Sequence, residues 1–162
     1  MGGRRVRPSD QRIMRTIARE HGYRSEQRVI DHIGLNVPNL DSARSYYDLI
    51  MPSVGYEPFF ATEEQFSYRP AGEKPGTMIF FYRAPLKGGY ERKHVGLEHL
   101  AFRARARAQV DDAHAKALEV GSTVLFSPRL FLQYHENYYA TFWFDPHGFL
   151  LEIVCNKAEP AG

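Results

Sequence analysis

The sequence predicts an α+β fold of two tandem βαβββ modules with mixed sheets, preceded by an extra N-terminal helix. The first observation is a repeat: residues 31–37 and 98–102 each begin with an acid and a histidine and continue as a strand pattern. The second is that a helix and three further strand patterns follow each stretch in the same order, which indicates an internal duplication. The third is the closing segment 143–154, in which Asp145-Pro146 and Gly148 predict a tight turn between two strands.

The chain divides into a basic arm, two modules and a short tail. The predicted parts are an arm with a helix at 1–28, module 1 at 29–84, a glycine-rich and charged linker at 85–94, module 2 at 95–157 and a tail at 158–162. The two modules and their linker form one domain. Much of the basic excess lies in the arm, and we interpret the arm as solvated, with contact to an anionic surface as the alternative.

Each module is expected to contain one helix and four strands. In module 1 the elements are a strand at 29–37, a helix that begins at Asn39 or Asp41 and ends before Pro52, and strands at 56–61, 65–69 and 77–83. In module 2 they are a strand at 95–103, a helix at 107–120 with Gly121 as its stop, and strands at 123–126, 139–144 and 149–156.

The composition is that of a globular protein and excludes several classes. Hydrophobic residues make up 43% of the chain and charged residues 25%, and no apolar run approaches the length of a membrane span. The single cysteine, Cys155, allows no internal disulfide and no thiolate-rich zinc site. We therefore expect a cytoplasmic protein that binds neither a membrane nor a nucleic acid, since a net charge of only +2 does not indicate a nucleic-acid partner.

Glu152 lies in the middle of the apolar strand predicted at 149–156. An ionised carboxylate buried without a partner carries a large desolvation penalty, so Glu152 needs a metal ion, another cation or an arginine beside it. Arg103 is available for an ordinary ion pair, which is the alternative to a metal.

His32 and His99 occupy matching positions in the two repeats. Each stands near the start of a first strand, on the face opposite the aliphatic residues, and in module 1 that face also carries Gly34 and Asn36. A lone strand histidine is more often a core or edge residue than a ligand. Two imidazoles and a carboxylate, however, are donors that hold a divalent first-row metal with positions left for a substrate. The coincidence of the three residues favours a metal site.

These pieces together resemble the vicinal oxygen chelate superfamily, which includes glyoxalase I, type I extradiol dioxygenases, fosfomycin-resistance enzymes and bleomycin-resistance proteins. The resemblance covers about 29–157 and depends on the opening residues 31–37, the restart at 98–102 and the Asp145-Pro146-His147-Gly148 turn before Glu152. It implies that the two modules build an incurved sheet with a metal ion in its concavity.

The resemblance implies that His32, His99 and Glu152 hold one divalent metal ion, which N and O ligands allow to be zinc, nickel, iron or manganese. Glyoxalase I has a fourth ligand, a glutamate, within the strand that corresponds to 78–82, where this chain has no carboxylate. The extradiol dioxygenases have a tyrosine where this chain has Phe142. These differences argue against ordinary glyoxalase I activity and against catechol-type ring cleavage. Three protein ligands are more similar to the fosfomycin-resistance or dioxygenase arrangement.

Further residues are expected around the cavity. The insert 127–138 of module 2 predicts a lid, and His135 within it is a candidate catalytic acid or base beside Glu152, with a solvated loop histidine as the alternative. The side chains expected to contact a planar or anionic substrate are Tyr82, Arg83, Arg103 and Tyr139. The two tyrosines are equally typical of ordinary amphipathic strand residues.

Two functions from different classes fit these observations. The first is a metal-dependent enzyme of the lyase, isomerase or oxygenase type that acts on a small, oxygen-rich substrate. The second is a metal-free protein that sequesters a planar drug or metabolite, as bleomycin-resistance proteins do, and such a protein has no need of the two histidines and the glutamate. Exposed edges of the first strands also predict a homodimer, with the site either inside one chain or shared across a two-fold axis.

Overall fold

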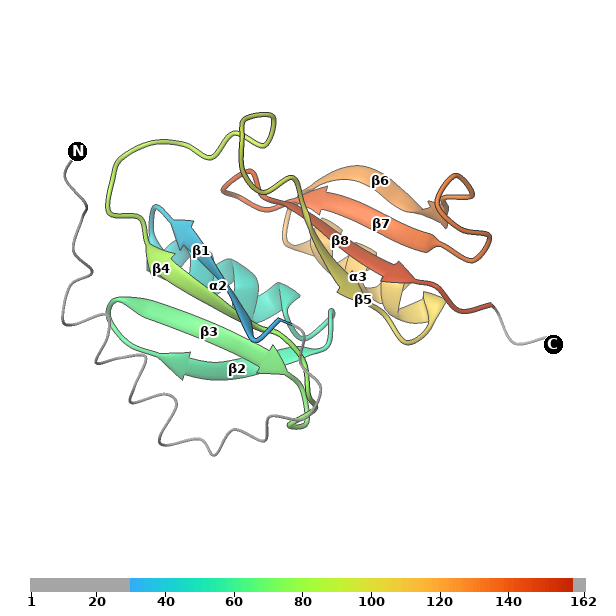
Figure 1. Cartoon of the computed structure of the whole chain (residues 1–162), viewed down its shortest axis with the longest axis horizontal. Coiled ribbons are helices and arrows are strands. Elements are labelled where there is room, and N and C mark those ends of the chain that lie inside the picture. The colour runs from blue at the N-terminus through green and yellow to red at the C-terminus, as the bar shows by residue number, and fades with distance from the viewer. Residues whose placement is uncertain (1–29, 159–162) are drawn as a thin grey trace.

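The computed structural model describes residues 30–158, which form two modules of the same topology joined by a linker that arches over one end of the molecule (Figure 1). The predicted arm with its helix, and residues 159–162 of the tail, lie outside the described residues. The two described helices have 11 and 13 residues, and no described helix has the length and hydropathy that crossing a bilayer requires.

Module 1 is a four-stranded mixed sheet with one helix. Its elements are β1 (His32–Val37), α2 (Leu40–Ile50), β2 (Tyr56–Ala61), β3 (Gln65–Pro70) and β4 (Met78–Arg83). The strand order is β1-β4-β3-β2, and β1 runs parallel to β4. Of the two predicted helix starts, the structure has the one at Asn39, because its Oδ1 accepts the amide hydrogen of Ser42 at 2.9 Å.

Module 2 repeats this arrangement. Its elements are β5 (Leu100–Arg103), α3 (Arg107–Glu119), β6 (Thr123–Leu130), β7 (Tyr139–Phe144) and β8 (Leu150–Cys155), in the strand order β5-β8-β7-β6 with β5 parallel to β8. The predicted turn between β7 and β8 is confirmed. Asp145 Oδ1 accepts the amide hydrogens of His147 and Phe149 at 2.9 and 2.7 Å, and Gly148 has a φ of +89°.

Two strand boundaries differ from the sequence prediction by four residues or more. The first strand of module 2 begins at Leu100 rather than at 95, and the carbonyl of Leu97 accepts a hydrogen bond from the Tyr90 hydroxyl in the linker. The strand predicted at 123–126 continues to Leu130, because its ladder with β7 resumes after a bulge.

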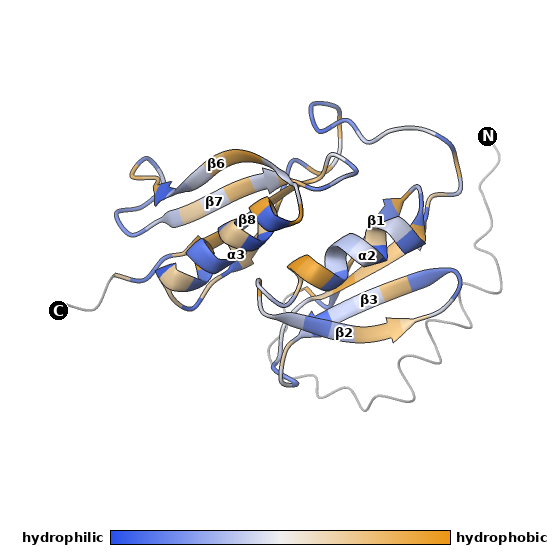
Figure 2. Ribbon diagram, turned by 180° about the vertical axis from the view of Figure 1, so that it is seen from behind, coloured by the Kyte–Doolittle hydropathy of each residue, from blue (hydrophilic) through white to orange (hydrophobic). Residues whose placement is uncertain are grey.

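One core joins the two modules. Both helices lie on the same side of the molecule (Figure 2), and buried residues of both modules belong to a single apolar cluster. Trp143 Nε1 donates to the Tyr46 hydroxyl at 3.1 Å, and the Tyr47 hydroxyl donates to Asp145 Oδ2 at 2.7 Å. The modules therefore pack through their helix-covered faces and form one unit.

The opposite face of each sheet, which we call the open face, carries the strand residues that alternate with the core residues. On module 1 it includes His32, Gly34, Phe80 and Tyr82, and on module 2 it includes Ala101, Ala140, Phe142 and Glu152. The loop between β6 and β7 covers part of the open face of module 2, where Phe131 packs on Phe142 at a ring distance of 5.3 Å. The two open faces are the places where the predicted site residues can act.

The two sheets remain separate in one chain. Within the described residues, β1 and β5 are edge strands, each paired on one side only. The α+β class and the two βαβββ modules are confirmed, and the two sheets of a single chain are not closed into the one incurved sheet that the family resemblance implies. Two unpaired first-strand edges are left available to another strand.

Candidate metal centre

Within residues 30–158, the polar partners of Glu152 are a tyrosine and a histidine, and not an arginine. Glu152 is 1% exposed in the middle of β8, where it lies opposite Ala101 of β5 and Phe142 of β7. The Tyr138 hydroxyl donates to its Oε1 at 2.6 Å, and its Oε2 lies 3.2 Å from Nε2 of His99. Among the described residues these two side chains are its polar partners. Burial raises the pKa of Glu152, and the hydrogen bonds from Tyr138 and His99 offset this only in part.

His99 is oriented by a second carboxylate. Its Nδ1 lies 2.5 Å from Oε2 of Glu98, and the other oxygen of Glu98 pairs with the guanidinium of Arg92 in the linker. Each ring nitrogen of His99 therefore faces a carboxylate oxygen. A proton on Nδ1 satisfies Glu98, and the remaining position between Nε2 and Glu152 Oε2 requires a cation, either a second proton or a metal ion.

Module 1 has the same acid–histidine pair. Nδ1 of His32 lies 2.9 Å from Oδ2 of Asp31, and the ring makes an edge contact with Phe80 at a centroid distance of 5.4 Å. The contact at Nδ1 leaves Nε2 available as a donor atom for a metal, as in His99. The duplicated sequence pattern thus corresponds to a duplicated local geometry.

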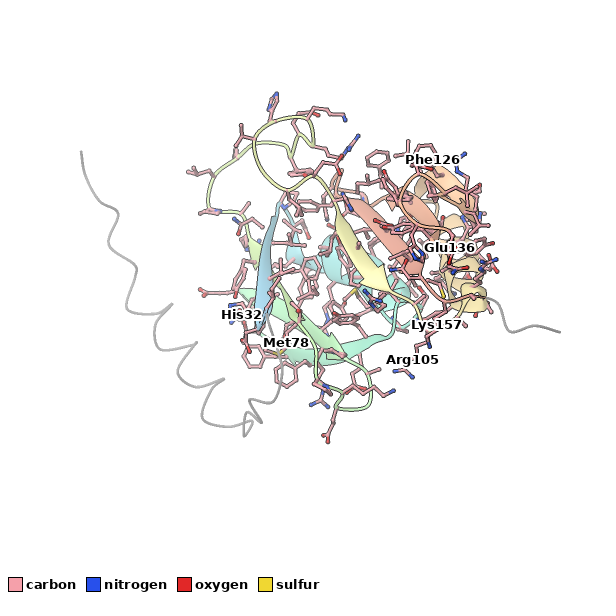
Figure 3. The ribbon with its side chains drawn as sticks, turned by 45° about the vertical axis from the view of Figure 1, so that its right-hand side comes forward. His32, Met78, Arg105, Phe126, Glu136 and Lys157 are labelled. Atoms are coloured by element: carbon pink, nitrogen blue, oxygen red, sulfur yellow. The ribbon has the colours of Figure 1, made fainter. Side chains whose placement is uncertain are left out.

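One chain does not bring His32 to the other two predicted ligands. His32 is the first residue of β1 and lies on the side of the molecule away from Glu136 in the β6–β7 loop (Figure 3). Among residues 30–158 no group of three or more histidine, cysteine, aspartate or glutamate side chains is close enough to hold a metal ion. The structure therefore brings His99 and Glu152 together and presents His32 elsewhere.

Two of the predicted substrate contacts belong to module 1. The ring of Tyr82 lies against Gly34, and a Cβ added to Gly34 would stand 3.1 Å from Cε2 of Tyr82. The same ring stacks on Phe80 at a centroid distance of 6.2 Å. Burial raises the pKa of Tyr82, so its hydroxyl keeps its proton at neutral pH. We call His32, Phe80 and Tyr82 the aromatic shelf. Arg83, the next residue, is exposed at the end of β4.

The other predicted contacts have different surroundings. Tyr139 lies on the helix-covered face of its sheet, where its hydroxyl donates to Asp111 of α3 at 2.8 Å, so it is on the opposite face from Glu152. Arg103 is exposed and lines a cavity between the modules rather than pairing with Glu152. His135 is exposed, and its Nδ1 accepts the amide hydrogen of Asn137 at 3.1 Å. The position of Tyr139 on the helix-covered face does not support its predicted role as a substrate contact at this site.

The residue that sequence reasoning missed is Tyr138. It ends the predicted lid, beside the candidate His135, and the fold returns it over the open face onto Glu152. Burial and the adjacent carboxylate raise the pKa of Tyr138, so it acts as a proton donor to Glu152. The sequence feature that could have identified Tyr138 is its aromatic hydroxyl in a loop expected to cover the cavity.

The donor set fits a divalent first-row metal. His99 Nε2 and Glu152 Oε2 already point to one position, both side chains are held by further hydrogen bonds, and the carboxylate lies where an uncompensated charge is costly. Two protein donors are fewer than such ions require, and within residues 30–158 one chain does not supply a third histidine or carboxylate at this position.

The chain matches a family model over residues 29–153, the model of the Glyoxalase/Bleomycin resistance protein/Dioxygenase superfamily. It is also 30% identical over 124 residues to the uncharacterised protein YqjT of Bacillus subtilis (strain 168), a match that covers 76% of this chain and 95% of the relative.

Solved structures agree with this match. The crystal structure of a candidate glyoxalase from Bacillus halodurans has a TM-score of 0.65 and 28% identity, over 80% of this chain and 96% of that one. The fosfomycin resistance protein FosX of Listeria monocytogenes has a TM-score of 0.57 and 16% identity, over 80% and 93%, and shares the fold. The chain therefore belongs to the glyoxalase/bleomycin resistance protein/dioxygenase superfamily, which is also called the vicinal oxygen chelate superfamily.

Proposed function

We propose that the protein is a metal-dependent enzyme that binds a small, oxygen-rich substrate at a divalent ion held by His99, Glu152 and His32. The observation that carries this proposal is the 3.2 Å approach of His99 Nε2 to the buried Oε2 of Glu152. A metal-free binding protein would gain nothing from a carboxylate at 1% exposure, because its burial opposes folding unless a cation compensates it.

The third ligand is proposed to come from a second chain. His32 does not reach the His99–Glu152 pair of its own chain, whose modules are fixed to each other by the shared core. The edges of β1 and β5 are available for pairing in a two-fold homodimer. In this dimer His32 of the partner subunit completes the site, and each dimer holds two sites.

The ion would supply Lewis acidity to two oxygens of the substrate, as lyase, isomerase and oxygenase reactions in this superfamily require. The chain's own residues have separate tasks. Glu98 holds the ring of His99, and Tyr138 holds Glu152 and keeps a proton close to the substrate. The aromatic shelf of the other chain offers a flat apolar wall. Zinc, nickel, iron and manganese all suit this donor set. A buried free cysteine, Cys155, supports placement in the reducing cytoplasm.

Metal content is the first test. We expect about one equivalent of a divalent metal per chain in protein purified without chelator, and a strong loss in Glu152→Ala and His99→Ala. Oxalate, a probe with two adjacent oxygens, should bind the metal-loaded protein and not the chelator-treated protein. A content below about 0.1 equivalent, with no binding of added manganese, iron, nickel or zinc, would overturn the proposal and favour sequestration on the aromatic shelf.

Mixed dimers test whether the site is shared. His32→Ala and Glu152→Ala chains, unfolded together and refolded, should regain metal at about one site in four, because half of the dimers are mixed and each has one intact site. The matched control mixes His99→Ala with Glu152→Ala. Both changes then affect the same half of the site, and we expect no recovery. Recovery in neither mixture, with full loading of the wild type, would contradict sharing while leaving the metal site in place.

A further inference from the structure

A cavity of about 470 Å³ lies between the two modules, apart from the His99–Glu152 pair. One wall comes from the start of β2 and the β3–β4 turn of module 1, and the other from the end of β5 and the start of α3 in module 2. The lining residues that matter here are Tyr56, Lys74, Gly76, Arg103, Arg105 and Gln109.

The charged side chains that line this cavity are all positive. Lys74 comes from module 1, and Arg103 and Arg105 come from module 2, while no aspartate or glutamate is among the lining residues. Within residues 30–158 none of these three side chains has a hydrogen-bond or ion-pair partner. Like charges gathered around one space repel each other and create a positive potential, which an anion would relieve.

The nearby acids are engaged elsewhere. Glu57 accepts a hydrogen bond from Arg69 Nε at 2.8 Å, and Glu73 lies 3.9 Å from Nη2 of the same arginine. Both acids lie in module 1 close to the cavity, but they pair with Arg69 and leave Lys74 without an acidic partner among the described residues. The cationic groups of the cavity are therefore left for a ligand.

The walls of the cavity are held in place. Gln109 Nε2 donates to the carbonyl of Ser53, and Gln109 Oε1 accepts the amide hydrogen of Arg105, so one side chain ties α3 to the loop before β2. Gly76 lies so close to Pro70 that a Cβ would stand 2.6 Å from the proline Cγ. The first turn of α3 beside the cavity contains no acid, and its N-cap Ala106 offers no side-chain acceptor, which adds to the positive potential.

We propose that this cavity is a binding site for a small dianion, a phosphate or dicarboxylate group, that bridges Lys74 of module 1 and Arg103 and Arg105 of module 2. The volume accommodates a phosphate group together with a small organic substituent. Guanidinium groups bind planar or tetrahedral oxyanions through paired N–H donors, and two of them with one ammonium supply three positive charges, enough to neutralise a dianion. The proposal is independent of the metal site.

The test measures binding of inorganic phosphate, phenyl phosphate and succinate to the chelator-treated chain by calorimetry at low ionic strength. We expect one saturable site per chain, weakened about tenfold or more by Arg105→Gln and by Lys74→Gln. The matched control is Lys87→Gln, which removes the same charge from the exposed linker and should bind as the wild type does. His99→Ala should also bind normally, which separates this site from the metal centre.

The three probes distinguish the source of the anion. Tighter binding of phenyl phosphate than of inorganic phosphate indicates an organic phosphate ester, equal binding indicates free phosphate, and tighter binding of succinate indicates a dicarboxylate. Amide chemical shifts should change at both Gly76 and Arg105 when the ligand binds, and changes in one module alone would overturn the bridging role. Absence of saturation at about 10 mM, or equal weakening by Lys87→Gln, would overturn the site.

Discussion

The hydroxyl of Tyr138 donates a 2.6 Å hydrogen bond to Oε1 of Glu152, and this leaves Oε2 directed at His99. Tyr138→Phe removes the donor and frees the carboxylate to rotate. We expect metal affinity to fall about tenfold, because loss of a group that orients a ligand has effects of this size. The metal-free protein should lose about 1 to 2 kcal/mol of unfolding free energy. Calorimetric metal titration and urea unfolding measure the two effects.

The control for this change is in the same loop. Tyr134 is 65% exposed, so Tyr134→Phe removes a hydroxyl that does not touch Glu152. Metal affinity of this variant should equal that of the wild type. Equal losses in the two variants would mean that the loop, and not the hydrogen bond to Glu152, holds the site.

Glu152→Gln should stabilise the metal-free protein at neutral pH. Burial raises the pKa of Glu152 in the folded chain, so the folded state binds the proton more tightly than the unfolded state does. The charged carboxylate therefore opposes folding once the pH exceeds its unfolded pKa, and the opposition is complete above the folded pKa. Urea unfolding should give a stability gain for the variant at pH 7 that vanishes below about pH 4.

With saturating metal, the wild type should instead be more stable than Glu152→Gln. The ion binds the wild-type carboxylate and stabilises the folded state by mass action, while the glutamine variant loses a ligand. Thermal unfolding with and without metal checks the reversal. Glu63→Gln, a change at an exposed acid, is the control and should respond to neither pH nor metal in this way. A glutamine variant less stable than the wild type under both conditions would contradict the account.

Tyr47→Phe should loosen the contact between the modules. Its hydroxyl donates to the buried Asp145 at 2.7 Å, and that hydrogen bond lowers the pKa of a carboxyl group that burial raises. Loss of a donor to a buried carboxylate costs about 1 to 3 kcal/mol. Chemical unfolding should show a lower midpoint, and proteolysis should cut the linker faster. An unchanged midpoint would mean that water replaces the hydroxyl at Asp145.

Gly34→Ala should act through Tyr82 alone. The added Cβ would stand 3.1 Å from the tyrosine ring, so the ring must move, at a cost of about 1 kcal/mol. In a Tyr82→Ala background the same change should cost almost nothing, and the difference in a double-mutant cycle isolates the contact. Equal costs in both backgrounds would locate the effect in the backbone of β1.

The sequence was sufficient for most of the fold because alternation and turn residues act locally. Asn39 and the Asp145 to Gly148 turn are examples in which a single side chain sets a boundary. The open-face positions of His99 and Glu152 also followed from period-two alternation. Tyr138 did not, because its approach to Glu152 depends on how a loop closes over a sheet. The position of Tyr139 depends on strand register, which places it on the same face as Trp143.

Local sequence patterns could not predict where His32 lies relative to His99 and Glu152. Duplication predicts equivalent positions in two modules, but whether these positions meet is decided by the packing of one module on the other. Here Tyr46 and Tyr47 of α2 bind Trp143 and Asp145 at the β7 end, and with the modules packed in this way His32 does not join His99 and Glu152 within one chain.

The core contact between the modules has a consequence for how the protein responds to its own abundance. In the proposed dimer, a chain whose modules are joined through their helices contributes ligands to two reaction centres, and a solitary copy would contain no complete centre. If the centres assemble between copies, turnover per chain would rise with protein concentration and collapse on dilution, so the level of expression would itself switch the activity on.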